Sequence, residues 1–246
     1  MSEANGASGD GRQPRAGRFW ILAALIVAGG ALLIAIVGMA TREPSNEFSR
    51  VAGVNDSQRI FGGVRQLGDR LGFGNAPVQI QYFTDVQSVP GAENLLAVVP
   101  ALVDSEIRNG VVQMLFRNRS LTRNPTQISF YGVEAAELQD AGWNYAYLMV
   151  RNLDLAERAG AIDEDFLADI AGGIERLEIP VWREDFERGL DPESAMTRGL
   201  EEDDKVAIDL ELRAEPAMVV AGPSGTEVLQ DSPDLARVRA AIARVR

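Results

Sequence analysis

A short strand that leads directly into a helix, within residues 78–96, restricts the possible folds of this chain more than any other stretch. Apolar residues alternate on one face from Val78 to Tyr82, as in a half-buried strand. Ser88 then occupies the position of a helix N-cap, and Pro90 falls in the first helical turn, where its missing N–H costs nothing. Free amides and the helix dipole favour an anion at such an N-terminus, so many folds place chemistry there.

The composition excludes several kinds of chemistry. The 246 residues include no cysteine and no histidine, which rules out disulfides, thiolate nucleophiles, Cys–His zinc sites and Ser-His-Asp triads. The formal net charge of −12 argues against a nucleic-acid partner, because the phosphates would be repelled. We therefore expect no nucleic-acid partner, no cofactor and no metal.

The negative charge is concentrated in one part of the chain. Residues 154–209 hold eighteen acidic against six basic residues, which predicts a solvated face or, alternatively, a docking surface. The run Glu201-Glu202-Asp203-Asp204 lacks the alternating ligand spacing and the glycine of a calcium loop. We therefore expect this run to be a solvated loop.

The N-terminal segments predict a membrane anchor. Residues 1–18 are rich in small and polar residues and are expected to form a disordered cytoplasmic tail. Residues 19–40 are 22 uncharged residues, which at about 1.5 Å each would span about 33 Å, enough to cross a bilayer. Three arginines precede this transmembrane helix, so the positive-inside rule places the N-terminus in the cytoplasm and the C-terminal domain outside the cell membrane. A cleaved signal peptide ending at Gly38-Met39-Ala40 is the alternative, and residues 41–75 are expected to be a linker.

The remaining residues, 76–246, are expected to form one domain. After the first strand and helix, the pattern predicts a second strand at 111–117 and a mainly helical insertion at about 127–210. A strand starting at Arg213, a turn, a short strand at 226–229 and a last helix capped by Ser232-Pro233 follow. The order β-α-β, helical insertion, β-β-α predicts an α/β fold.

This order and several local stretches resemble the DsbA-like thiol–disulfide oxidoreductases in their membrane-anchored form. Phe83-Thr84-Asp85-Val86-Gln87 resembles the stretch just before that family's redox motif, and Glu215-Pro216-Ala217 lies where the family has its cis-proline. The resemblance covers about residues 66–242. It implies a thioredoxin-like fold with an inserted helical subdomain.

The positions of the redox motif depart from the family. In the resemblance, Ser88, Val89, Pro90 and Gly91 occupy the Cys-x-x-Cys positions, and Tyr82 replaces the buried acid that moves protons for the thiolate. The similarity therefore implies a degenerate, redox-inactive member. In the family, the backbone beside the cis-proline pairs with an extended peptide, and the corresponding residues here are Ala214, Glu215, Pro216 and Ala217.

The leading interpretation is a single-pass membrane protein whose extracytoplasmic thioredoxin-like domain binds a protein or peptide, as a chaperone-like module. It is not expected to be an enzyme. Two alternatives stay open. A small external thiol bound at the Ser88 helix end would give a cysteine-independent enzyme, although no histidine is present to activate Ser88 itself. The acidic helical insertion would instead act as an assembly scaffold.

Overall fold

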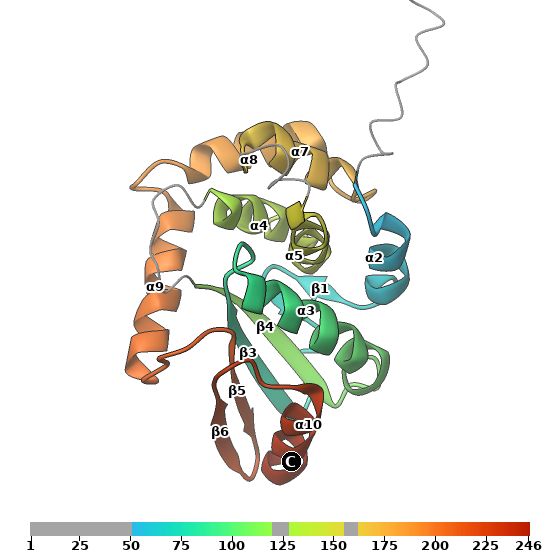
Figure 1. Cartoon of the computed structure of the whole chain (residues 1–246), viewed down its shortest axis with the longest axis vertical. Helices are drawn as coiled ribbons and strands as arrows, with labels where there is room; N and C mark the ends of the chain where they lie inside the picture. The colour runs from blue at the N-terminus through green and yellow to red at the C-terminus, as the bar shows by residue number, and fades with distance from the viewer. Residues whose placement is uncertain (1–50, 120–127, 155–161) are drawn as a thin grey trace, which may run out of the picture. The chain divides into compact units, whose positions relative to one another are not determined.

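A computed structural model describes residues 51–119, 128–154 and 162–246 of the chain. Its apolar strand β3 (Val78–Thr84) lies at the centre of a six-stranded sheet with the order β1-β2-β4-β3-β5-β6 (Figure 1). β3 pairs in parallel with β4 (Val112–Asn118) and antiparallel with β5 (Ala217–Gly222). The other strands are β1 (Gln66–Leu67), β2 (Arg70–Leu71) and β6 (Gly225–Leu229).

Two helices cover one face of this sheet. α3 (Val89–Leu102) follows β3 and continues into the π-helix η2 (Val103–Ile107), while α10 (Leu235–Val245) packs against β5, β6 and α3 (Figure 1). The N-cap of α10 is Asp234, whose Oδ1 accepts a hydrogen bond from Arg237 N at 2.8 Å. The cap expected at Ser232-Pro233 was therefore placed two residues too early.

The described elements between β4 and β5 are all helices, which confirms the helical insertion. Helix α5 (Gly142–Arg151) lies at its centre and is buried on nearly every side, because it packs against α3, α2 (Val54–Phe61), α4 (Ser129–Glu137) and α7 (Glu164–Gly172). Its aromatic residues Trp143, Tyr145 and Tyr147 are buried and belong to the core. The helices are α4 (Ser129–Glu137), α5 (Gly142–Arg151), α7 (Glu164–Gly172), α8 (Ile179–Gly189) and α9 (Ala195–Asp209).

Two groups of stacked rings meet at α5. Trp143 forms the sheet ring cluster with Tyr82 of β3, whose ring centroid is 6.4 Å away, and with Phe116 of β4 at 5.2 Å. Tyr145 forms the insertion ring cluster with Trp182 of α8 at 5.8 Å, and Trp182 stacks on Phe186 at 5.2 Å. All six rings are at most 2 % exposed, so both clusters are core.

The segment expected to be a linker, 41–75, is structured in its described part. Helix α2 (Val54–Phe61) packs on α5, and Phe61 meets Tyr147 edge to face at 5.9 Å. The helix ends where Gly62 and Gly63 follow, and Arg108 donates hydrogen bonds to three carbonyl oxygens at that end. The domain boundary at 76 was therefore wrong, because short elements before it complete the core.

Two further expectations need correction. β5 begins at Ala217 rather than Arg213, since the chain first passes through the segment containing Pro216. The run Glu201 to Asp204 lies in α9 rather than in a loop, and Asp203 is buried there. Within the described ranges no helix is long and apolar enough to cross a membrane; the expected span, 19–40, lies outside them.

Candidate functional site

The start of α3 is built by hydrogen bonds from Ser88. Its Oγ accepts from Gly91 N at 3.0 Å, which makes Ser88 the helix N-cap, as its sequence position predicts. The same hydroxyl donates to the carbonyl oxygen of Asp85 at 3.1 Å. Val89 and Pro90, the next two residues, are exposed, and the Val89 side chain is 60 % exposed. The single hydroxyl proton of Ser88 is thus already used, which leaves none for an external thiolate.

Gly91 fills a space that admits no side chain. A Cβ at this position would lie 2.3 Å from the backbone oxygen of Asp85 and 2.6 Å from Thr84 Oγ1. Because one of these neighbours is backbone, it cannot move aside as a flexible side chain could. Position 91 is therefore packed for glycine, and a cysteine would not fit there without a shift of the loop before α3.

Tyr82 lies under the start of α3 as part of the core. It is completely buried in the sheet ring cluster, and its hydroxyl donates a long hydrogen bond of 3.5 Å to the Gly91 carbonyl. Burial raises the pKa of Tyr82 above its ordinary value, because the charged phenolate would be desolvated. The phenol thus remains neutral near pH 7 and cannot relay protons as a carboxyl group would.

The second predicted segment lies at the same end of the sheet. The peptide bond between Glu215 and Pro216 is cis, and the Pro216 carbonyl accepts a hydrogen bond from Ser232 N at 3.2 Å. Ala217 then pairs with Phe83, the penultimate residue of β3. Phe83 lies five residues before Ser88. The pairing of β3 with β5 therefore places the segment containing Pro216 and the start of α3 at the same end of the sheet (Figure 1).

The residues around Pro216 differ in their access to a partner. Ala214 and Glu215 are half-buried. Ala217 is completely buried in a small apolar cluster with Phe83 and Val219, so its side chain faces the core. Only Ala214 and Glu215 among the expected contact residues beside the proline therefore present partly accessible side chains.

Arg119, which was not predicted from the sequence, stabilises this end of the sheet by hydrogen bonds. Its backbone N–H donates to the Thr84 carbonyl at 3.0 Å, and its guanidinium donates to the Leu212 carbonyl at 2.8 Å. Arg119 is buried and joins the end of β3 to the segment that leads to Pro216. Nothing in the local sequence indicates this function, because both partners are distant along the chain.

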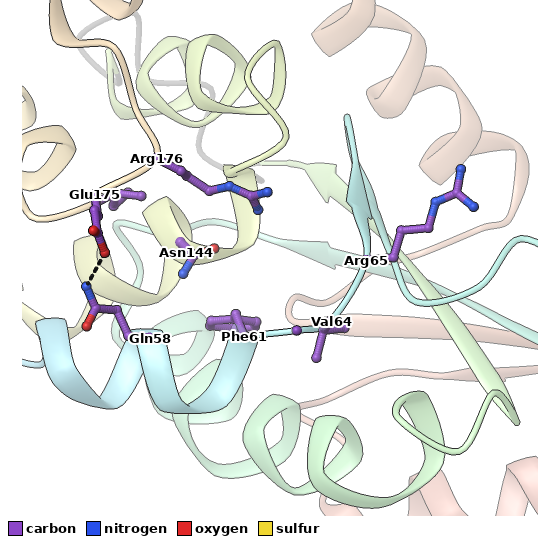
Figure 2. Close-up of a pocket in the computed structure, with 10 residues that line it drawn as sticks. Gln58, Phe61, Val64, Arg65, Asn144, Glu175 and Arg176 are labelled. Atoms are coloured by element: carbon purple, nitrogen blue, oxygen red, sulfur yellow. Dashed lines mark hydrogen bonds between the residues drawn. The ribbon is translucent and has the colours of Figure 1, made fainter.

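A cavity of about 650 Å³ lies elsewhere, between α2, α5 and the segment after α7. Figure 2 shows Gln58 of α2 reaching Glu175, with 3.5 Å between Nε2 and Oε2, and Asn144 behind them. Asn144 is fixed by hydrogen bonds with Ser57 and Gln66. The cavity could not be predicted, because its α2 wall falls in the expected linker.

Comparison with known proteins supports the fold assignment. By sequence, the chain matches no protein-family model and no curated protein. By structure, it is similar to BdbD from Bacillus subtilis, with a TM-score of 0.57 and 16% identity over 73% of this chain and 95% of that one. It is also similar to α-DsbA1 from Wolbachia pipientis, with a TM-score of 0.57 and 13% identity over 77% and 94% of the two chains. A third similar structure is DsbA2 from Pseudomonas aeruginosa, with a TM-score of 0.53 and 17% identity over 71% of this chain and 92% of that one.

The fold is therefore a DsbA-like thioredoxin fold with a helical insertion, built by a chain without cysteine. Thiol–disulfide exchange by the protein's own groups is impossible, because no sulfur nucleophile exists. Among the residues that the structure describes, no group of three or more Asp or Glu side chains is arranged to hold a metal ion.

Proposed function

We propose that this chain binds an extended segment of a protein at the face formed by Ser88–Gly91, Ala214 and Glu215, which we call the motif face. One observation supports the proposal most directly. The segment that leads into α3 and the segment containing Pro216 lie at the same end of the paired strands β3 and β5, which suits peptide binding in this fold. Ser88 there caps α3, while Gly91 and Tyr82 are closely packed.

The chemistry of the motif face suggests what it would bind. Val89 supplies an exposed apolar side chain for one residue of a partner segment. Glu215 is half-buried beside the cis-proline, with its Oε2 enclosed, and places a negative charge near this face. A positively charged residue at that point in the partner would therefore be favoured. The partner is accordingly an extended segment with an apolar and a basic residue, and no redox step is involved.

The proposed setting is the outer side of a cell membrane. Residues 19–40 would anchor the chain, with residues 1–18 in the cytoplasm, on the sequence argument from hydropathy and flanking charge. This placement suits a chaperone-like or scaffolding protein that holds exported polypeptides near the membrane.

Photocrosslinking in cells tests this function. A photoreactive amino acid replaces Val89 in one variant and Ile208 of α9 in a matched control, because both side chains are exposed and apolar, at 60 % and 62 %. A discrete protein adduct from position 89 alone would support binding at the motif face, and Glu215→Arg should then reduce it.

An adduct from position 208 alone would contradict the proposal and favour assembly through the helical insertion. Mutations for that alternative should spare Asp185, since it is buried and paired with Arg188. Glu184 and Glu187 are exposed on the same helix and are suitable for charge removal.

A further inference from the structure

A second cavity, lined by acidic side chains, lies between the β1–β2 turn, β4, α4 and α9. The proposed function does not use it. Its volume is about 300 Å³, comparable to that of about ten water molecules. Five carboxylates and one guanidinium line it, from the β1–β2 turn, β4, α4 and α9; we call it the acidic cavity. These residues are Asp69, Arg117, Glu134, Glu137, Glu202 and Asp203.

Partners inside the protein satisfy only part of this charge. Arg117 donates to Asp203 Oδ1 at 3.0 Å and lies 3.7 Å from Asp69 Oδ2. Glu134 accepts a hydrogen bond from Asn118 at 2.9 Å. Arg70 also lies 3.6 Å from Asp69 Oδ1. Two guanidinium groups therefore serve the five carboxylates, and the lining is left with an excess of negative charge.

Glu137 is the group that most clearly requires a partner. It is only 8 % exposed, and its enclosed Oε1 meets no hydrogen-bond donor among the described residues. Its Cγ packs so closely on Gly142 that a Cβ there would come within 2.3 Å, so the side chain is held in place. A buried carboxyl group without a donor must be neutralised by a proton or by a cation.

We propose that the acidic cavity binds an organic cation with several N–H donors, a guanidinium or alkylammonium group, with Glu137 as its principal acceptor. Such a group can donate to carboxylates on more than one wall, whereas a point charge satisfies fewer acceptors. A bare metal ion is disfavoured, because the described acidic side chains include no set arranged for metal ligation.

The protonation of the empty cavity agrees with this ligand. Burial raises the pKa of Glu137 well above its ordinary value and raises that of Glu134, while it brings the pKa of Asp203 to about 7 in spite of Arg117. An entering cation would stabilise the ionised carboxylates, and binding should therefore release protons at neutral pH.

Calorimetric titration of the full chain with agmatine, which carries both cationic groups, tests the proposal. Runs at constant ionic strength in two buffers of different ionisation enthalpy give the affinity and the protons released. We expect saturable binding with proton release, and Glu137→Gln should weaken it about tenfold or more, as expected for loss of a charged hydrogen bond. Glu187→Gln on α8, an exposed site, removes the same charge and should change nothing.

Because Glu137→Gln could itself impair folding, a second variant tests the cavity without changing any carboxylate. Gly199 of α9 lines the cavity, and a Cβ there would meet nothing within 4 Å. Gly199→Leu should therefore fill the space, keep every carboxylate and abolish binding. A blocked Gly-Arg-Gly peptide distinguishes the source of the cation, since binding of the peptide indicates a protein side chain and binding of agmatine alone a free small molecule.

Three results would overturn the proposal. The first is the absence of saturable heat with agmatine, and the second is binding of agmatine by both cavity variants as tightly as by the wild type. Saturable binding of Mg²⁺ or Ca²⁺ with none of agmatine would likewise show that the cavity serves a different class of ligand.

Discussion

Replacing Gly91 by alanine should destabilise the chain, although the same substitution at Gly199 should stabilise it. Both glycines lie in helices, at the third position of α3 and inside the 15-residue α9. The added methyl group would lie 2.3 Å from the Asp85 carbonyl oxygen in the first case and in open space in the second. The two variants thus share one chemical change and differ only in surroundings.

The size of each effect can be estimated from these surroundings. Overpacking against backbone costs about 1–3 kcal/mol, and the helix preference of alanine over glycine returns at most about 1 kcal/mol. Gly91→Ala should therefore lower the free energy of unfolding by about 1–2 kcal/mol. Gly199→Ala has only the gain, about 0.5–1 kcal/mol.

Urea unfolding followed by circular dichroism measures both values, and the midpoints should move in opposite directions at an unchanged slope. The reasoning fails if Gly91→Ala is as stable as the wild type, because the loop before α3 would then yield without cost. The same clash applies to cysteine. Placing two cysteines at these positions by Ser88→Cys with Gly91→Cys would accordingly need a displaced Asp85 carbonyl.

Three other changes have defined outcomes. Ser88→Ala removes the N-cap hydrogen bond of 3.0 Å and should cost about 1 kcal/mol in urea unfolding, against no loss for Ser88→Thr, which keeps the hydroxyl. Tyr82→Phe should lower the free energy of unfolding by less than about 1 kcal/mol, because the hydrogen bond that it removes is long. Tyr82→Glu should lower it by more than about 2 kcal/mol, because it places a carboxyl group among buried aromatic rings. Equal stabilities of the two variants would contradict this prediction. In the folded state, burial raises the pKa of Asp203 from 3.8 to about 7. Between these two values the folded chain holds a proton that the unfolded chain releases. The free energy of unfolding should therefore fall as the pH rises from about 4 to 7. Asp203→Asn should reduce this fall, and an unchanged pH profile would refute the assignment.

Local signals made part of the site predictable. Ser88 and Pro90 specify a helix start through the hydrogen-bonding capacity of one side chain and the ring of the other, and neither depends on distant residues. The alternation within Val78–Thr84 likewise predicts a central strand. These elements, with their order along the chain, predicted an α/β fold, and the resemblance to the DsbA-like family implied its thioredoxin-like form.

The features that escaped prediction depend on residues far apart in sequence. β1 and β2 have two residues each, too few to show a period, and α2 is completed by Arg108, which lies 46 residues beyond Gly62. The inward orientation of Asp203 depends on Arg117, 86 residues earlier. From sequence alone, the run from Glu201 to Asp204 was therefore expected to be solvated, because its partner Arg117 is distant along the chain.

Helix α5 joins the two halves of the domain into one cooperative unit. Trp143 and Tyr145 are two residues apart, so they project about 200° apart around the helix, one into the sheet ring cluster and the other into the insertion ring cluster. Unfolding of the insertion alone would withdraw α5 and leave Tyr82 without its stacked neighbour. The sheet and the insertion should consequently melt in one transition, and the relative placement of the motif face and the insertion should be fixed rather than hinged.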